Sequence, residues 1–249
     1  MAKRGRVDKK LAKGKAERPL RIKTYKYIFL IVCEDEKTEP QYFKQFVSLF
    51  PERTLYLKPI GSGSQWLGVI DRAIQEKVNL SLEVKREVDY VWVVFDRDDA
   101  HLKESTTKIF NEALIKAQEQ EFKIAYSNEV FELWLLLHLE DMPCSQSENT
   151  IYSALHRNDI YTNLQEAIRK YPNYSSYIYD HRKPAKDQKN IIEVIQEIGN
   201  ESEAIKRAEV ILEAQLGIPE IFANPSTKVH LLVKEIREWI DFFLQNEAL

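Results

Sequence analysis

The sequence is poor in glycine, proline and cysteine. Its 249 residues include 7 glycines and 9 prolines, a composition that excludes low-complexity and collagen-like chains. The two cysteines are Cys33, in an apolar run, and Cys144, in a polar stretch. They form neither a disulfide framework nor a zinc knuckle. A reducing compartment is the simplest setting for such a chain.

Long apolar runs are also missing. No stretch approaches the roughly 20 residues that cross a bilayer, and the basic N-terminal segment lacks the apolar core of a secretory signal. Hydrophobic residues make up 44% of the chain and charged residues 30%, as in soluble globular proteins. The length suits one α/β domain with a smaller appendage. We therefore expect a cytoplasmic protein with no membrane partner.

Charge is distributed unevenly along the chain. Residues 1–26 contain eleven basic and two acidic residues, a charge of +9, and since the whole chain carries −3, the remainder carries −12. A basic arm on an acidic body favours binding to a polyanion, and a solvated leader that aids solubility is an equal alternative. If the partner is nucleic acid, the expected contacts come from this arm and from a second basic cluster: Arg4, Arg6, Lys9, Lys10, Arg182 and Lys183.

The first half of the chain alternates between strand and helix patterns. Residues 27–33 and 88–95 are continuous apolar runs, typical of strands that are buried on both faces of a parallel sheet. Shorter strands are expected over 55–60 and 122–126. Helical spacing of apolar residues predicts helices after the first strand and over about 65–79, 106–119 and 130–139. This alternation predicts an α/β fold with a mostly parallel sheet flanked by helices.

Beyond about residue 145 the pattern indicates helices only. They are expected over 164–170, 191–198, 202–216 and 227–245, with a tyrosine-rich connection between the first two. The sequence thus predicts three parts. These are a basic, flexible arm over 1–26, an α/β core over 27–144, and a helical C-terminal region over 145–249 packed on the core.

Two of the expected strands end in acidic residues. Glu34 follows the first, and Asp96 and Asp98 follow another. Ligands bind at the carboxyl ends of strands in open α/β sheets, so these acids can converge if the two strands are neighbours. Clustered carboxylates repel one another unless a divalent cation compensates, and oxygen ligands favour Mg²⁺, Mn²⁺ or Ca²⁺ over Zn²⁺. The sequence therefore predicts a metal site here. The alternative is that residues 96–99 turn the chain and cap the next helix.

Other polar residues permit two interpretations. Lys37 could stabilise a pentacovalent phosphate or be an exposed lysine. Glu132, beside a strongly apolar run, would be costly to bury unless it is paired or metal-bound, so we expect it to face the acids with Lys37 or a second metal as its partner. Asn128 and His138 are interpreted as structural. The Gly-Ser-Gly-Ser loop at 61–64 lacks the full phosphate-loop pattern and is interpreted as a flexible turn.

Three motifs resemble those of a known family. Residues 31–43, IVCEDEKTEPQYF, resemble the VCEGEKTEPxYF signature of the RloB family. Residues 91–99, VWVVFDRDD, resemble its second motif, and residues 126–138, YSNEVFELWLLLH, resemble its third, SNPCFELWLLLH. A weaker C-terminal motif starts at Asn224. The motifs occur in order and span about residues 25–235.

The resemblance implies a Toprim-like catalytic core, in which a Glu after the first strand and an Asp-x-Asp after a later one form the active site. They correspond here to Glu34, Asp96 and Asp98. It also implies a role in bacterial anti-phage defence through abortive infection, often beside an ATPase partner. Asp35 stands in place of the usual glycine, and Glu129 and Val130 in place of the usual proline and cysteine. These departures remove no expected metal ligand.

We expect a nuclease that depends on Mg²⁺ or Mn²⁺ and cleaves phosphodiester bonds of nucleic acid. Glu36 and Lys37 would assist the three metal-binding acids. The first alternative is a nonhydrolytic Toprim-like sensor of nucleotides or nucleic acid that signals to an ATPase. Others are a haloacid-dehalogenase-like phosphatase, whose Asp-x-Asp normally follows the first strand, and a Mn²⁺-dependent sugar-nucleotide transferase. The sequence is compatible with a homo-oligomer and does not distinguish DNA from RNA or one metal from two.

Overall fold

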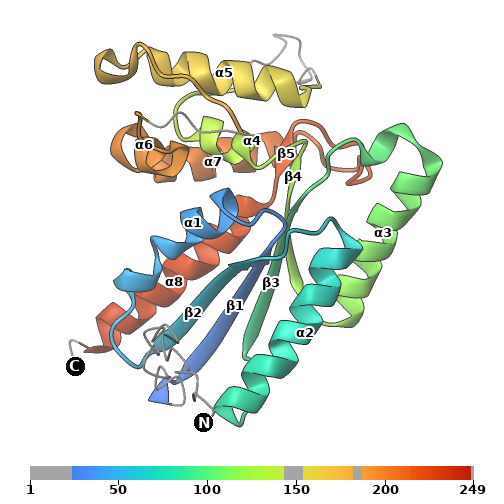
Figure 1. Ribbon diagram of the computed structural model, residues 1–249, viewed down its shortest axis with the longest axis vertical. Coiled ribbons are helices and arrows are strands. Elements are labelled where there is room, and N and C mark those ends of the chain that lie inside the picture. Colours follow the sequence, from blue (N-terminus) through green and yellow to red (C-terminus); the bar gives the residue numbers. More distant parts are fainter. Residues whose placement is uncertain (1–23, 143–153, 182–186, 248–249) are drawn as a thin grey trace, which may run out of the picture.

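A single mixed sheet forms the centre of the protein (Figure 1). The computed structural model describes residues 24–142, 154–181 and 187–247. The sheet has the order β2-β1-β3-β4-β5, in which the first four strands are parallel and β5 is antiparallel to β4. The strands are β1 (Tyr27–Cys33), β2 (Leu55–Gly61), β3 (Tyr90–Asp96), β4 (Lys123–Asn128) and β5 (Ser226–Thr227).

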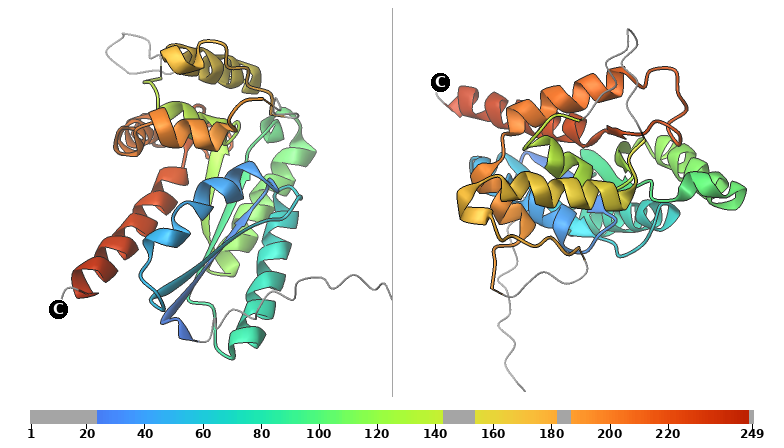
Figure 2. Two further views of the ribbon diagram at one scale, coloured as in Figure 1. Left: turned by 60° about the vertical axis from the view of Figure 1, so that its left-hand side comes forward. Right: turned by 90° about the horizontal axis from the view of Figure 1, so that it is seen from above.

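Helices cover both faces of this sheet. One face packs on α2 (Leu67–Val84) and α3 (Glu104–Glu119), and the other on α1 (Thr38–Lys44) and α8 (Val229–Glu247), as Figures 1 and 2 show. Because every residue of β1 after Tyr27 is buried, alternate side chains of this strand enter two separate apolar clusters. Burial on both faces explains why the strand reads as one uninterrupted apolar run.

A third group of helices lies beyond the carboxyl ends of the parallel strands (Figure 1). It contains α4 (Glu132–Leu137), α5 (Arg157–Arg169), α6 (Ile191–Ile198) and α7 (Glu201–Glu213), and their apolar faces join the α1 and α8 cluster. The short 3₁₀ helices are η2 (Val47–Leu49), η3 (Ala100–Leu102) and η4 (Pro172–Tyr174). These helices and the segments that connect them cover the edge of the sheet where the acidic residues lie, and we call them the roof.

The predicted α/β class with a mostly parallel sheet is confirmed. The expected helix over 191–198 has the observed bounds of α6, because Asn190 and Glu193 form reciprocal capping hydrogen bonds. The prediction of helices alone beyond residue 145 is wrong at Ser226–Thr227, which pair with β4 as β5. Helix α5 also starts at Arg157 rather than near residue 164. The earlier start was not predicted because the first turn of the helix is mostly polar.

The basic residues expected to contact nucleic acid lie outside the described residues. They are Arg4, Arg6, Lys9, Lys10, Arg182 and Lys183. None of the helices in the described ranges combines the length and apolar character that a membrane span requires.

Candidate functional site

The acids predicted to converge come from neighbouring strands. Strands β1 and β3 pair in parallel with Cys33 opposite Val94, so Glu34 and Asp96 leave the same edge of the sheet. The backbone N–H of Glu34 donates to the carbonyl of Val94 at 2.8 Å. The backbone N–H of Asp96 donates to Glu34 Oε2 at 3.1 Å. The sheet itself therefore aims the Glu34 carboxylate at Asp96.

Asp96 carries a polar atom without a partner. Its Oδ1 is buried and accepts no hydrogen bond from the described residues, whereas the indole N–H of Trp66 holds its backbone carbonyl at 2.9 Å. Burial raises the pKa of Asp96 well above its usual range, and repulsion from Glu39 and Glu34 raises it further. A buried carboxylate oxygen with no donor is costly, so this atom is placed to accept a cation or a proton.

Glu34 is the second strongly perturbed acid. Burial raises the pKa of Glu34 to about 8, and repulsion from Asp98 adds to the rise. Glu39, on α1, is 2% exposed and accepts the backbone N–H of Asp35 at 3.1 Å. Its own pKa is raised by burial and then by repulsion from Glu34. Glu39 was not among the predicted site residues, because it does not directly follow a strand.

Asp98 belongs to the same group but its carboxylate is directed elsewhere. The residue has a φ of 50°, and its N–H donates to the carbonyl of Glu129 at 3.0 Å. Gln65 Nε2 donates to its Oδ2 at 3.0 Å, and Arg157 Nη2 donates to its Oδ1 at 2.6 Å. Asp98 thus connects the acidic edge to the start of α5.

The loop at 61–64 has a defined role in positioning Glu34. Ser62 N–H donates to the carbonyl of Cys33 at 2.8 Å, and Gly63 N–H to that of Glu34 at 3.0 Å. A Cβ on Gly61 would lie 2.5 Å from both the carbonyl oxygen of Asp35 and the Cα of Glu36. Glycine is required at this position because the two backbones touch. The loop therefore supports the backbone beside Glu34 as well as connecting β2 to α2.

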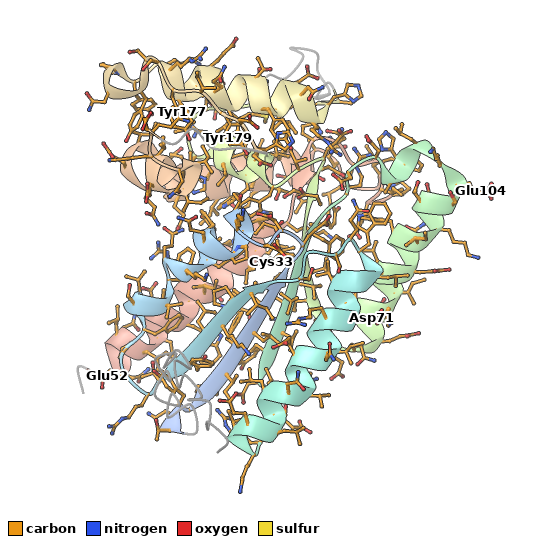
Figure 3. The ribbon with its side chains drawn as sticks, in the orientation of Figure 1. Cys33, Glu52, Asp71, Glu104, Tyr177 and Tyr179 are labelled. Atoms are coloured by element: carbon orange, nitrogen blue, oxygen red, sulfur yellow. The ribbon has the colours of Figure 1, made fainter. Side chains whose placement is uncertain are left out.

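A cavity of about 570 Å³ opens between the acids and the helical roof. Its lining includes Glu34 and Asp96 from below and Tyr161 and Tyr179 from above. Figure 3 shows Tyr179 and Tyr177 in the roof, beyond the end of β1 where Cys33 lies. The cavity is large enough for a nucleotide-sized ligand, and it presents carboxylates on one wall and aromatic rings on the other.

Glu132 faces this cavity, as predicted, but its partner differs from the expected one. The residue is 8% exposed and lines the cavity with Glu34. The hydroxyl of Tyr179 donates to Glu132 Oε1, and this contact replaces the expected one with Lys37. Burial raises the pKa of Glu132. Glu36 and Lys37 are exposed on the cavity rim.

Asn128 and His138 have structural contacts. The side-chain amide of Asn128 donates to the carbonyls of Ala223 and Glu220, so it fixes the strand end to the segment before β5. His138 is hydrogen-bonded to the hydroxyl of Tyr42 at 3.2 Å, and burial lowers the pKa of His138 to about 4. Both observations agree with the structural interpretation.

The donor chemistry of the site fits a hard divalent cation. Glu34 and Asp96 supply carboxylate oxygens, and the unpartnered Oδ1 of Asp96 lies among groups that repel one another. Within the described ranges, no three acidic, histidine or cysteine side chains are grouped closely enough to hold a metal ion. Asp98 would have to exchange Arg157 for the ion to complete a set of three.

The motifs at this site correspond to those of one protein family. The sequence pattern of the family described as RloB-like protein matches residues 29–236. The chain belongs to the RloB-like protein family. Searches of curated proteins and of solved structures return no match to it. The match includes β3, β4, the roof helices and all but the first two residues of β1 of this RloB-like protein.

Sequence reasoning on this RloB-like chain missed the residues that close the site from above. Arg157 lies 59 positions from Asp98 in the sequence. It begins a helix whose first turn is mostly polar, so the sequence pattern did not indicate where this helix starts. Tyr179 lies in a tyrosine-rich stretch that was interpreted only as a connection. Pairing across such separations has no local signal, although four tyrosines between two helices indicate a segment that is partly buried.

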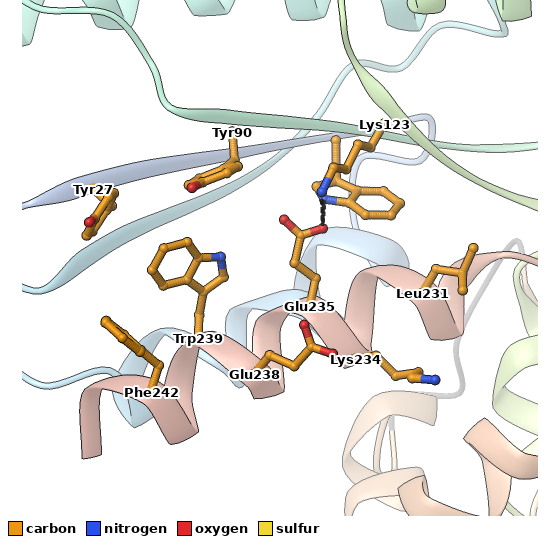
Figure 4. Close-up of a pocket in the computed structure, with 10 residues that line it drawn as sticks. Tyr27, Tyr90, Lys123, Leu231, Lys234, Glu235, Glu238, Trp239 and Phe242 are labelled. Carbon is orange, nitrogen blue, oxygen red and sulfur yellow. Dashed lines mark hydrogen bonds and ion pairs between the residues drawn. The ribbon is translucent and has the colours of Figure 1, made fainter. Parts of the chain in front are cut away.

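A second cavity lies at the other end of the sheet. It has a volume of about 700 Å³ and lies between α8 and the starts of the strands (Figure 4). Tyr27 and Tyr90 are the first residues of β1 and β3, and Glu235 binds Trp92 Nε1 at 3.2 Å and Lys123 Nζ at 2.6 Å. This cavity shares no lining residue with the first one and is therefore separate from the acidic edge of the RloB-like protein.

Proposed function

We propose that this RloB-like protein is a metal-dependent nuclease that cleaves phosphodiester bonds of nucleic acid. The observation that carries the proposal is the convergence of Glu34 and Asp96 from adjacent parallel strands, with the buried Oδ1 of Asp96 lacking a partner among the described residues. A set of acids with mutually raised pKa values at the carboxyl edge of a parallel sheet is typical of a functional site.

In this proposal the ligands to Mg²⁺ or Mn²⁺ are Glu34 and Asp96, with Asp98 as the third. The ion, when bound, would polarise a phosphate oxygen and stabilise the leaving oxygen. Trp66 fixes Asp96 through its backbone carbonyl. Glu132, held by Tyr179, supports the site from the roof, either as a ligand to a second ion or as a carboxylate that orients the first.

Two rim residues complete the assignment. Glu36 is exposed beside the cavity and can receive a proton from an attacking water molecule. Lys37 is exposed at the same rim and can approach the charge that develops on the phosphate. No serine or cysteine nucleophile is required, and the free Cys33 is buried in the apolar core.

The biological setting rests on family resemblance rather than on geometry. RloB proteins are associated with anti-phage and abortive-infection loci in bacteria, often beside an ATPase. We accordingly propose that the protein is a cytoplasmic defence nuclease. Its activity should be measured both alone and with a neighbouring ATPase.

The experiment is a cleavage assay on purified protein. Wild type is incubated with DNA, RNA and tRNA in Mg²⁺, Mn²⁺ or EDTA, beside Asp96→Asn and Glu34→Gln. Each variant should cleave at least about 100-fold more slowly than wild type, because losing a metal ligand removes several kcal/mol of transition-state stabilisation. Glu209→Gln, which removes an exposed carboxylate paired with Lys234, is the control. Full activity in either site variant would exclude this metal site.

A nonhydrolytic sensor is the second candidate. It is favoured by the observation that Asp98 is bound by Arg157, so that the acids of the described ranges are not grouped around one point. A sensor would bind a nucleotide or an oligonucleotide without metal-dependent cleavage and would change the ATP hydrolysis rate of its partner. The same cleavage assay separates the two functions.

A further inference from the structure

Arg157 is a cation placed at the edge of the acidic group. It is the first residue of α5, and its Nη2 lies 2.6 Å from Asp98 Oδ1 and 3.9 Å from Asp99 Oδ2. Its side chain is 36% exposed. Both contacts use Nη2, which is one of three nitrogens in the guanidinium fork. The side chain therefore reaches the acids while part of it still faces solvent.

The charge of Arg157 acts on three acids of this edge. It lowers the pKa values of Glu34 and Glu132 against the larger effect of burial, and it opposes the burial of Asp98 in the same way. A phosphodiester that approaches these carboxylates is repelled unless cations compensate their charge. Arg157 supplies such a charge from the roof, across from the ends of β1 and β3.

A buried chain of contacts fixes the position of Arg157. Its backbone N–H donates to Glu129 Oε2 at 3.0 Å, and Glu129 Oε1 accepts Arg97 Nη2 at 2.7 Å. The side chains of Glu129 and Arg97 are 2% and 1% exposed. Because Arg97 lies between Asp96 and Asp98 in the sequence, this chain ties the start of α5 to the loop that carries the acids. Little ordering of the backbone is then needed when Arg157 meets a ligand.

We propose that Arg157 binds a non-bridging oxygen of the substrate phosphodiester beside Asp98, exchanging the Asp98 carboxylate for the phosphate. The proposal rests on the proposed function, because it takes the substrate to be nucleic acid. The planar fork of arginine matches two phosphate oxygens, which a lysine does not. Release of Asp98 by Arg157 would also free that carboxylate to join Glu34 and Asp96.

The test measures binding rather than turnover. Fluorescence anisotropy of a short labelled single-stranded DNA, and of an RNA of the same sequence, is recorded in EDTA and in Ca²⁺ between about 50 and 200 mM salt. Arg157→Gln should weaken binding and lower the slope of log K against log salt by about 0.7, the value for one phosphate contact on a single strand. Arg157→Lys should retain the slope with reduced affinity.

Arg72→Gln is the matched control. Arg72 is 45% exposed and binds Glu76 at 2.9 Å, a pair similar to Arg157–Asp98 but on α2. This variant should bind both oligonucleotides as wild type does. Thermal melting checks that Arg157→Gln folds, since a partly exposed pair contributes little to stability.

Two results would overturn the role of Arg157. One is wild-type affinity and slope in Arg157→Gln, and the other is failure of wild type to bind either oligonucleotide. Cleavage decides the proposed function separately. A wild type that binds through Arg157 but cleaves nothing supports the phosphate contact and contradicts the nuclease. A wild type that cleaves, with an unchanged Arg157→Gln slope, supports the nuclease and contradicts the contact.

Discussion

Single carboxylates at the acidic edge have opposite effects on function and on stability. The pKa of Glu34 is about 8, above the ordinary glutamate value of roughly 4.3. Between these values the folded protein holds a proton that the unfolded chain has released. The stabilisation from this bound proton is therefore complete below the unfolded pKa and is lost as the pH rises through about 8.

Glu34→Gln should accordingly be more stable than wild type at pH 8 and nearly equal to it at pH 4. The difference should be on the order of a few kcal/mol, at about 1.4 kcal/mol for each pKa unit. Urea unfolding of both proteins in EDTA, across this pH range, measures it. Parallel profiles for the two proteins would show that Glu34 is not perturbed.

Glu129 is expected to behave in the opposite way. It forms a buried pair with Arg97 and accepts the N–H of Arg157, so Glu129→Gln leaves a buried guanidinium without its counter-charge. Breaking such a pair costs about 3–5 kcal/mol. Glu209→Gln breaks an exposed pair with Lys234 and should cost less than about 1 kcal/mol. Urea unfolding at neutral pH compares the two, and equal costs would contradict the account of the buried pair.

At the scale of elements, the sequence predicted the strands and helices whose residues carry a local signal, such as an apolar run or a capping pair. The interior positions of β1 and β3 are apolar because both faces of these strands are buried, and α6 begins where its capping residues require. Strand β5 has two polar residues, Ser226 and Thr227, and exists only because β4 offers an open edge. Such an element depends on tertiary contact and leaves no periodic signal.

The same distinction applies to the site. Glu34, Asp96 and Asp98 were predicted because each follows a recognisable strand, and the neighbouring positions of β1 and β3 then bring them to one edge. The roof residues Arg157 and Tyr179 were not predicted, because their approach depends on how α5 and the segment before α6 pack. The positions of strand-end residues follow from the sheet topology, whereas the positions of roof residues depend on packing between segments that are distant in the sequence.

The close approach of the end of β2 to the Glu34 loop gives a prediction at this scale. A Cβ at Gly61 would meet backbone atoms of Asp35 and Glu36 at 2.5 Å, so Gly61→Ala must displace the loop. We expect a loss of about 1–3 kcal/mol in stability together with reduced metal-dependent cleavage. Ser64→Ala, in the same loop, adds no atom and is the control. Calorimetry and the cleavage assay measure both effects, and wild-type behaviour of Gly61→Ala would refute the close approach.

The whole molecule combines a strongly acidic body with a basic N-terminal segment. Residues 1–26 carry +9 and the remainder −12, so a polyanion is repelled by much of the protein before it reaches the cavity. The acidic edge needs local cations, and Arg157, which pairs with Asp98, is one of them. The charge of the N-terminal segment can act at longer range, up to the Debye length of about 10 Å at ordinary salt.

Deletion of residues 1–20, which removes eight basic residues, should therefore weaken nucleic-acid binding and leave the metal site intact. The slope of log K against log salt should fall by about 0.7 for each single-strand phosphate that the segment neutralises in the wild type. A variant with these residues in scrambled order is the control, because binding by charge alone tolerates a change of order. Binding that is unchanged by the deletion would assign the segment to solubility. Weaker binding in the scrambled variant as well would instead indicate recognition that depends on the order of the residues, and such recognition would not scale with charge.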